Sequence, residues 1–193
     1  IVALALFASA GSYAGARPWT YLILVVLIQF VTALLLIPRR PDLLIERSQW
    51  GEGIKPWDIA LAVFMGYGPA LLALAAGLER RAGAPPAPLS LVAVLAVIVA
   101  ILGTLFTLWA MTSNPFFSGL VRIQQDRGHT VADTGPYAYV RHPGYLGMLV
   151  FTLAAPFILG SGWAGVVAAL ILGITVVRTA LEDRTLQQEL PGY

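Results

Sequence analysis

The stretch LGMLVFTLAAPFILGSGWAGVVAALILGITVV, residues 146–177, contains no charged side chain. As a single helix it would be about 48 Å long, whereas the hydrocarbon layer of a bilayer is about 30 Å thick. Three residues that break or terminate helices, Pro156, Gly160 and Gly162, lie at its centre. We therefore predict that this stretch folds back on itself as a helical hairpin.

The rest of the chain is also apolar, with 58% hydrophobic and only 11% charged residues. Soluble domains carry roughly one quarter charged residues. The runs Trp19–Ile37, Trp57–Leu78 and Leu89–Met111 are each long enough to cross a bilayer and contain no Lys, Arg or Glu. Asp58 is the one acidic residue in them, and we expect it to reach the interface or to cap its helix.

The apolar segment Ile1–Gly15 is predicted to be a further span. A cleaved signal peptide is the alternative, but no basic residues precede the segment. The predicted fold class is therefore all-α: a polytopic transmembrane helical protein with about four spans and a C-terminal helical hairpin.

Basic residues are distributed unevenly over the loops that these spans define. If residues 146–177 form a hairpin, one side of the membrane carries nine basic residues and the other three; a single crossing would give seven and five. The bias of Lys and Arg toward the cytoplasm favours the hairpin and places the richer side in the cytoplasm. The nine are Arg39, Arg40, Arg47, Lys55, Arg122, Arg127, Arg141, Arg178 and Arg184, and the three are Arg17, Arg80 and Arg81.

Several classes of site are unsupported by the sequence. The chain has no cysteine, and its two histidines, His129 and His142, do not form an HExxH motif, so neither a thiolate nucleophile nor a zinc enzyme is expected. It contains neither a GxGxxG nor a GxxxxGK[ST] loop. No nucleic-acid partner is expected.

Polar residues gather in two blocks, residues 121–145 and 178–193, on either side of the predicted hairpin. The hairpin would bring the two blocks to the same face of the membrane. His142 and Glu182, which are far apart in the sequence, would then share one cavity.

The first block contains GPYAYVRHPGYLG, residues 135–147. Because Pro143 suits the first turn of a helix and restricts His142, we predict that a helix begins at Pro143. Its free amide groups would favour an anionic group such as a carboxylate. The rings of Tyr137, Tyr139 and Tyr145 can pack on an aromatic base or a cation, so the block could hold a zwitterionic, nucleotide-like cofactor. Ordinary interfacial anchoring is the alternative.

In the second block, Arg178 and Glu182 share one helix face, and Asp183 lies beside them. A solvated amphipathic helix would explain these charges. However, Arg178 directly follows the apolar stretch, close to membrane depth, where charged groups are costly and commonly functional.

These motifs resemble those of the isoprenylcysteine carboxyl methyltransferase family and its phospholipid methyltransferase relatives. The resemblance covers about residues 121–193 and departs from the family pattern at Asp183, where glutamate is usual. It is carried by Gly135, Pro136, Tyr137, Arg141, His142, Pro143, Tyr145 and Gly147, and by Glu182, Asp183, Leu186, Gly192 and Tyr193.

The resemblance implies an integral membrane methyltransferase that uses S-adenosylmethionine and a lipophilic acceptor, with a carboxylate as the expected acceptor group. Arg178 and Glu182 are the implied catalytic residues: Arg178 would clamp the carboxylate, and Glu182 would orient Arg178 or the cofactor. The implied cofactor-binding residues are Gly135, Pro136, Tyr137, Arg141, His142, Pro143, Tyr145, Glu182 and Asp183.

We expect one integral membrane domain over residues 1–193, with transmembrane helices in 1–111 and a catalytic region in 112–193. The 11 Arg against one Lys suggest a GC-rich bacterial genome, so the expected location is a bacterial inner membrane. The distribution of basic residues over the loops places the site on the cytoplasmic face. Two other functions stay open at this stage. One is an NADPH-dependent membrane reductase of the sterol reductase type, and the other is a non-enzymatic membrane scaffold.

Overall fold

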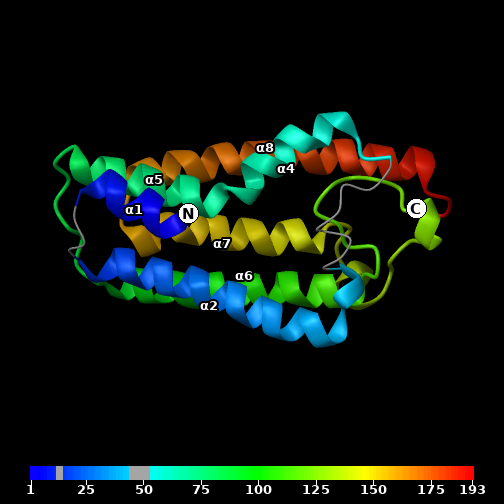
Figure 1. Ribbon diagram of the computed structural model, residues 1–193, viewed down its shortest axis with the longest axis horizontal. Helices are drawn as coiled ribbons and strands as arrows, with labels where there is room; N and C mark the ends of the chain where they lie inside the picture. Colours follow the sequence, from blue (N-terminus) through cyan, green and yellow to red (C-terminus); the bar gives the residue numbers. More distant parts are fainter. Residues whose placement is uncertain (12–14, 44–52) are drawn as a thin grey trace.

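The computed structural model describes residues 1–11, 15–43 and 53–193, and the regular structure in these ranges is entirely helical. The all-α fold class is therefore confirmed for the described residues. Figure 1 shows an elongated bundle in which most helices run along the long axis. The α-helices are α1 (Val2–Ala10), α2 (Ala16–Arg39), α4 (Pro56–Gly66), α5 (Gly68–Arg81), α6 (Leu91–Ser113), α7 (Pro143–Leu159) and α8 (Gly162–Glu189), and two short 3-10 helices are η1 (Gln125–Arg127) and η2 (Gly135–Ala138).

Three of these helices, α2, α6 and α8, are long and apolar enough to cross a membrane, and the bent pair α4 and α5 would together form a fourth crossing. The first and third predicted spans correspond to α2 and α6. The span predicted at Ile1–Gly15 is not confirmed, because α1 has nine residues. A helix of that length is only about 14 Å long.

The second predicted span, Trp57–Leu78, is not one straight helix. Helix α4 ends at Gly66, α5 begins at Gly68, and their axes differ by 48°. Pro69 has no amide proton to donate and disfavours a helical backbone at Gly68 before it, so the regular hydrogen bonding is interrupted there. This bend turns α4 away from the line of α5 and toward the polar end of α8 (Figure 1).

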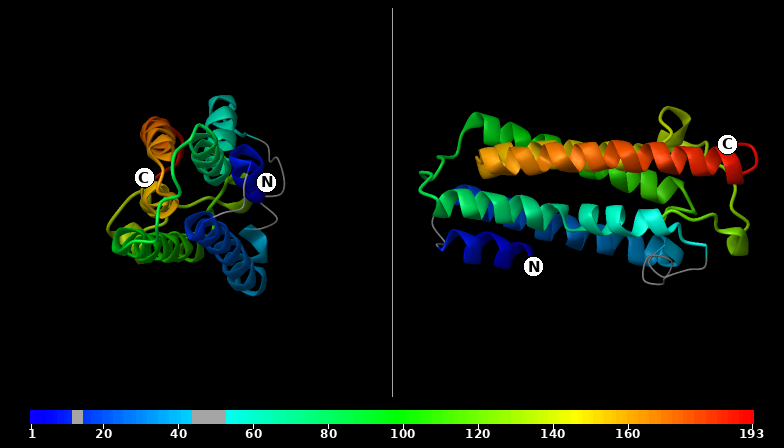
Figure 2. Two further views of the ribbon diagram at one scale, coloured as in Figure 1. Left: turned by 90° about the vertical axis from the view of Figure 1, so that its left-hand side faces the viewer. Right: turned by 90° about the horizontal axis from the view of Figure 1, so that it is seen from above.

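The chain reverses direction between α7 and α8, which lie side by side in antiparallel orientation (Figures 1 and 2). Gly160 ends α7 with a left-handed backbone, φ 66°, and the hydroxyl of Ser161 caps α8 by accepting a hydrogen bond from the amide of Ala164 at 3.0 Å. Pro156 lies within α7 and does not end it. Helix α8 continues past the apolar stretch, so its full length of about 42 Å exceeds that of α7 by far.

Close backbone contact between α6 and α7 places the start of α7. A Cβ atom on Gly103 would lie 2.7 Å from the carbonyl oxygen of Gly147, and one on Gly147 would lie 2.5 Å from that of Gly103. Only glycine fits such an approach, because any side chain would force the two helices apart. The His142–Tyr145 segment is thereby held against the end of α6.

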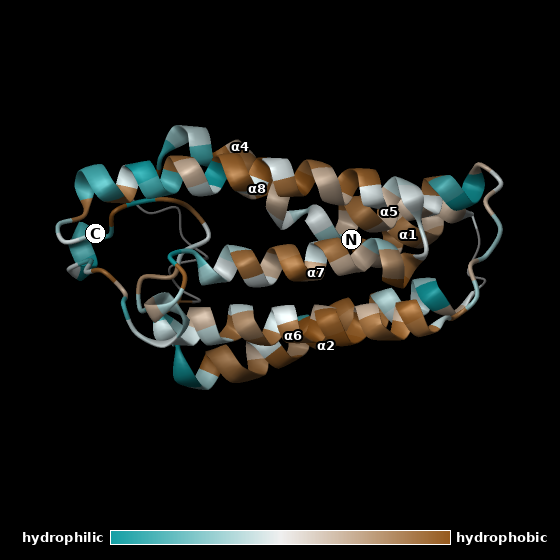
Figure 3. Ribbon diagram, turned by 180° about the vertical axis from the view of Figure 1, so that it is seen from behind, coloured by the Kyte–Doolittle hydropathy of each residue, from teal (hydrophilic) through white to brown (hydrophobic). Residues whose placement is uncertain are grey.

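Hydropathy divides the molecule along its long axis. Apolar residues cover the middle of the helices, and hydrophilic residues gather at the two ends, most extensively at the end that carries the C-terminus (Figure 3). Many large apolar side chains on α2, α6 and α8 are exposed, as in Phe30, Leu102 and Val166. Such surfaces suit a lipid environment. Arg47, which contributed to the charge count, lies outside the described residues.

Candidate functional site

A cavity of about 280 Å³ opens at the end of the bundle that carries the C-terminus. Its walls come from the segment between α6 and α7, the start of α7, the last part of α8 and the C-terminal residues. Six of the residues proposed from the sequence line it: Tyr137, Arg141, His142, Tyr145, Arg178 and Glu182. The structure thus brings both polar blocks to one cavity.

Helix α7 begins at Pro143, which confirms the predicted start. Its first backbone hydrogen bond runs from the amide of Leu146 to the carbonyl of His142, at 3.2 Å. The amides of Gly144 and Tyr145 precede that bond, as expected for the first turn of a helix. Gly144 lines the cavity, and the Phe117 ring lies so close to it that a Cβ atom there would come within 2.7 Å of the ring.

Tyr145 joins α7 to α8 across the cavity. Its hydroxyl donates a short hydrogen bond to the Glu182 carboxylate. The His142 ring stacks on Tyr145, with ring centres 5.7 Å apart and planes inclined by 16°. Ring stacking and this hydrogen bond thus link His142, Tyr145 and Glu182 to one another.

Asp183 lies at the rim, where it contacts Tyr193, Arg141 and His142, and it also accepts a hydrogen bond from Gln187 on its own helix. Its carboxylate accepts a hydrogen bond from the Tyr193 hydroxyl at 2.7 Å, pairs with Arg141 at 3.2 Å and lies 3.4 Å from Nε2 of His142. Tyr193 lines the cavity, whereas Asp183 does not. Asp183 therefore fixes the residues around the opening.

Gly135, Pro136 and Pro143 do not line the cavity. Both prolines are fully buried. Gly135 has a positive φ of 60°, and a side chain there would collide with Ser113 at the end of α6. These residues shape the backbone that carries Tyr137 and His142.

Arg178 has a partner that the sequence did not suggest. Its Nε and Nη2 donate to the two carboxylate oxygens of Asp58 at 2.6 and 2.9 Å, and Nη2 also donates to the carbonyl of Gly119 at 2.8 Å. The prediction that Asp58 reaches the interface or caps α4 is wrong, because its side chain is fully buried and makes no capping bond. Glu182, which was expected to orient Arg178 or the cofactor, accepts a hydrogen bond from the Tyr145 hydroxyl.

The tyrosines of the first block differ in exposure. Tyr137 lines the cavity, and burial, reinforced by the charge of Glu182 and opposed by a hydrogen bond with Asn114, raises the pKa of its hydroxyl to about 12. It therefore stays protonated and can donate a hydrogen bond at neutral pH. Tyr139 is 84% exposed and is not among the residues that line the cavity.

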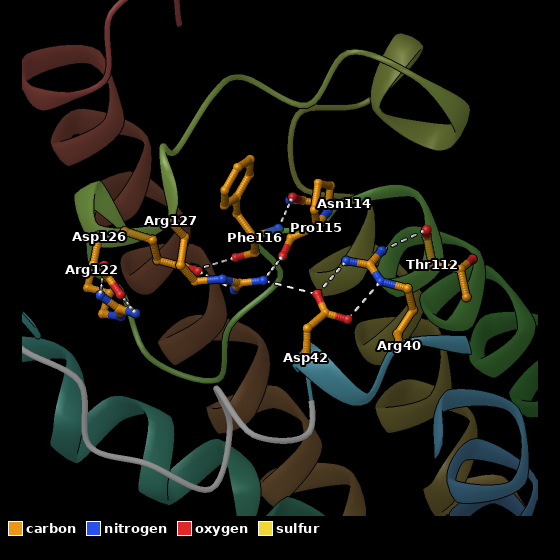
Figure 4. Close-up of polar contacts among 10 residues, drawn as sticks. Arg40, Asp42, Thr112, Asn114, Pro115, Phe116, Arg122, Asp126 and Arg127 are labelled. Carbon is orange, nitrogen blue, oxygen red and sulfur yellow. Dashed lines mark hydrogen bonds and ion pairs between the residues drawn. The ribbon is translucent and has the colours of Figure 1, made fainter. Parts of the chain in front are cut away.

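The segment after α6 is held in place by an ionic network (Figure 4). Nη2 of Arg127 lies 3.0 Å from the Asp42 carboxylate and also donates to the Pro115 carbonyl at 3.0 Å. Asp42 pairs in turn with Arg40 at 3.0 Å, and Arg40 donates to the Thr112 carbonyl at 3.1 Å. Nothing in the spacing of these residues indicated that they would meet beside the cavity.

His129 lies on the same cavity, although it is outside the motif that suggested the site. Its Nδ1 accepts a hydrogen bond from the amide of Gln124 at 3.2 Å, and its ring lies 4.5 Å from that of Phe116. Burial and the charges of Arg122 and Arg127 lower the pKa of His129 below its ordinary value of 6.5. The imidazole is therefore neutral at neutral pH.

The cavity offers three kinds of group to a ligand: aromatic faces, a carboxylate and a guanidinium. Within the part of the chain that the structure describes, Nη1 of Arg178 makes no hydrogen bond, and Arg178 lines the cavity. No cluster of three or more His, Cys, Asp or Glu side chains in the described ranges is arranged to hold a metal ion.

Together, the apolar helices and the polar cavity at their end are those of an integral membrane protein with a polar cavity at one end of its helices. Residues 94–188 match the model of the Isoprenylcysteine carboxyl methyltransferase (ICMT) family. The resemblance to this family inferred from the sequence motifs is thereby confirmed. The match runs from α6 through most of α8 and includes every proposed site residue.

One curated relative is the "Protein-S-isoprenylcysteine O-methyltransferase" of Schizosaccharomyces pombe, which is 34% identical to this chain over 56 residues. The aligned segment covers 29% of this chain and 24% of the relative, so the chain spans about a quarter of that protein's length in the match. No solved structure matches the chain.

Proposed function

We propose that the protein transfers a methyl group from S-adenosylmethionine to a lipophilic acceptor embedded in the membrane. A carboxylate is the proposed acceptor group, in line with the reaction named for the S. pombe relative. The observation that carries the proposal is the shared cavity, in which the start of α7 and the polar part of α8 face each other within the region that matches the family.

The cavity suits the chemical groups of S-adenosylmethionine. The free amides at the start of α7 and the charge of Arg141 favour its carboxylate. The ring of Tyr137 offers a face for its adenine or its sulfonium cation. Tyr145, whose ring contacts His142 and Arg178, lines the same cavity. Glu182 was expected to orient either Arg178 or the cofactor. Because Asp58 already holds the Arg178 guanidinium, we assign the Glu182 carboxylate to the positively charged part of the cofactor. His142 packs against Tyr145 and is held at the rim by Asp183, and Gly135, Pro136 and Pro143 shape the backbone that carries these residues.

S-adenosylmethionine supplies an electrophilic methyl group on a positively charged sulfur when it is bound. An acceptor carboxylate needs no general base, because it already carries the attacking electron pair. Arg178 would hold the acceptor carboxylate beside the bound cofactor, so that one carboxylate oxygen could take the methyl group while the sulfur would keep the electrons of the broken carbon–sulfur bond. The task of the protein is therefore to align the two groups and to exclude water.

Arg178 is proposed to hold the acceptor carboxylate through Nη1, while Asp58 and Gly119 engage its other nitrogens. A guanidinium fixed in this way presents its donor in one direction, which favours alignment. Residues 112–193 thus form the proposed catalytic region, and the bilayer beside the exposed apolar helices is the proposed source of the acceptor.

The proposed orientation places the cavity in the cytoplasm of a bacterial cell, at the inner membrane. The C-terminal end of α2, the start of α4, the segment between α6 and α7 and the end of α8 lie at this end (Figures 1 and 3), and they carry Arg39, Arg40, Lys55, Arg122, Arg127, Arg141 and Arg184. The start of α2 and the end of α5 lie at the opposite end, and they carry Arg17, Arg80 and Arg81. This asymmetry supports the orientation. The antiparallel α7–α8 pair returns the chain to the same end, which supports a hairpin that enters and leaves from the cytoplasm.

The two alternative functions are not favoured by the family match. An NADPH-dependent reductase and a non-enzymatic scaffold are nevertheless separable from a methyltransferase by ligand binding. Isothermal titration of the detergent-purified protein with S-adenosylhomocysteine and with NADPH is the first test. We expect binding of the former, and binding of NADPH alone would refute the proposal.

Activity is tested by transfer of radiolabelled methyl from S-adenosylmethionine to three classes of lipophilic acceptor: carboxylic acids, including S-prenylated cysteine derivatives, thiols and amines. We expect transfer to carboxylic acids. Transfer to amines or thiols alone would support methyltransferase activity but would refute the proposal that the acceptor group is a carboxylate.

A further inference from the structure

We propose that Asp58 is a positioning residue that fixes the guanidinium of Arg178 at the wall of the cavity. The inference rests on the proposed function and adds a residue to its machinery. Asp58 belongs to α4 and lies outside residues 94–188, the range that matches the family. The pairing therefore extends the site into the N-terminal half of the chain.

The geometry leaves Arg178 little freedom. Two of its nitrogens, Nε and Nη2, reach separate oxygens of the Asp58 carboxylate at 2.6 and 2.9 Å. A third bond, from Nη2 to the carbonyl of Gly119 at 2.8 Å, fixes the plane of the guanidinium. The Tyr145 ring covers the group, with its centre 5.3 Å from Cζ. Paired donors in a planar fork set direction as well as distance.

Asp58 is itself held from a second side. Its Oδ2 accepts a hydrogen bond from the amide of Val121 at 2.7 Å, and the carbonyl of Val121 accepts from the amide of Lys55 at 3.0 Å. Val121 lines the cavity. One carboxylate therefore joins α4, the cavity wall and α8 at a single point.

Burial explains why this carboxylate matters to Arg178. Asp58 is 0% exposed and Arg178 is 6% exposed, so each charge depends on the other for compensation. Arg17, at the opposite end of the bundle, is also buried, yet it donates to the carbonyls of Pro88 and Phe157 and to the hydroxyl of Ser90. Arg17 is thus satisfied by neutral acceptors, whereas the Arg178 guanidinium is held by a charged partner.

The test compares wild type with Asp58→Asn, Arg178→Gln and the double variant. Each protein is measured for S-adenosylhomocysteine affinity, thermal stability, and kcat and KM for methyl transfer to a lipophilic carboxylic acid. We expect both single variants to keep cofactor-product affinity within about threefold and to lose kcat by about tenfold or more. If Asp58 acts through Arg178, the double variant should lose no more than about threefold beyond the weaker single variant.

The double variant also guards against a failure to fold. It removes both charges together, so neither partner is left as an uncompensated buried ion, and it tests the role even where a single variant does not fold. Glu79→Gln is the matched control, because Glu79 accepts hydrogen bonds from Ser161 and Trp163 at the opposite end. Its kcat should remain that of wild type.

Three results would overturn the inference. The first is a kcat for Asp58→Asn within about threefold of wild type. The second is a fold-loss in kcat of the double variant that equals the product of the losses in the two single variants. The third is a folded double variant with wild-type kcat. A wild type that neither binds S-adenosylhomocysteine nor transfers methyl overturns the proposed function itself, and the positioning role with it.

Discussion

Nε2 of His142 lies 3.4 Å from Oδ1 of Asp183, although 41 positions separate the two residues in the chain. The contact joins the start of α7 to the polar part of α8. Tyr145 and Glu182 make a second link one helical turn deeper. The two polar blocks therefore form one structural unit, and a substitution in either block should change the affinity for a ligand bound between them.

Replacement of His142 tests the cofactor assignment. His142→Ala should weaken S-adenosylhomocysteine binding by about tenfold or more, equivalent to about 1.4 kcal/mol, because the ring that supports Tyr145 is lost. Isothermal titration in detergent measures the change. Tyr139→Ala is the control, since Tyr139 is 84% exposed in the same segment and should bind as wild type. Equal affinities in folded His142→Ala and wild type would remove His142 from the site.

A change at Arg178 separates charge from geometry. Arg178→Lys keeps a positive charge, but an ammonium group cannot reproduce the planar fork that reaches Asp58 and Gly119 together. We expect loss of turnover by about tenfold or more, with S-adenosylhomocysteine affinity within about threefold of wild type.

The split between kcat and KM reports when Arg178 acts. A loss in kcat would mean that the contact strengthens as the methyl group transfers, and a rise in KM would mean that it holds the acceptor in the ground state. Arg184→Lys, an exposed position on the same helix, is the matched control. Wild-type kinetics in Arg178→Lys would exclude Arg178 from the acceptor site.

Membrane orientation can be measured by single cysteines, since the chain contains none. Ser48 would be a natural position by sequence, but it lies outside the described residues. Thr134→Cys and Gln188→Cys, both exposed at the polar end, should react with an impermeant maleimide from the cytoplasmic side only. Ala82→Cys, exposed after α5, should react from the opposite side. Labelling of Gln188→Cys and Ala82→Cys from one side would contradict the proposed topology.

Acid should destabilise the protein through His129. Its pKa is lowered on folding, chiefly by burial and also by Arg122 and Arg127, so the unfolded chain binds more protons than the folded chain between that lowered pKa and 6.5. The contribution of neutral His129 to stability is therefore complete above pH 6.5 and is lost as the pH falls through the lowered pKa.

Thermal unfolding in detergent at about pH 7.5 and about pH 5.5 measures this effect. His129→Asn keeps an acceptor for the amide of Gln124 without a titrating ring, so its melting temperature should fall less on acidification. An equal fall in wild type and His129→Asn would contradict the assignment.

Sequence alone determined the features that depend on neighbouring residues and on length. The apolar runs predicted helices of membrane length, Pro143 predicted the start of α7, and the glycines near residue 160 indicated where α7 ends. The Gly68–Pro69 signal for a bend was also local, but the length of the apolar run concealed it. The motif GPYAYVRHPGYLG, together with Glu182 and Asp183, was enough to reveal the resemblance to the family whose model matches residues 94–188.

Tertiary structure decided which charged groups meet. Asp58 and Arg178 are 120 positions apart, and Asp42 and Arg127 are 85 apart. Neither pair shares a helix or a recognisable spacing. The packing of helices creates them: the bend at Gly68 turns α4 toward α8, and the Gly103–Gly147 contact holds α7 against α6. Helix propensity and hydrophobic length act along the chain, whereas the partner of a buried charge is selected by the space that remains once the helices have packed.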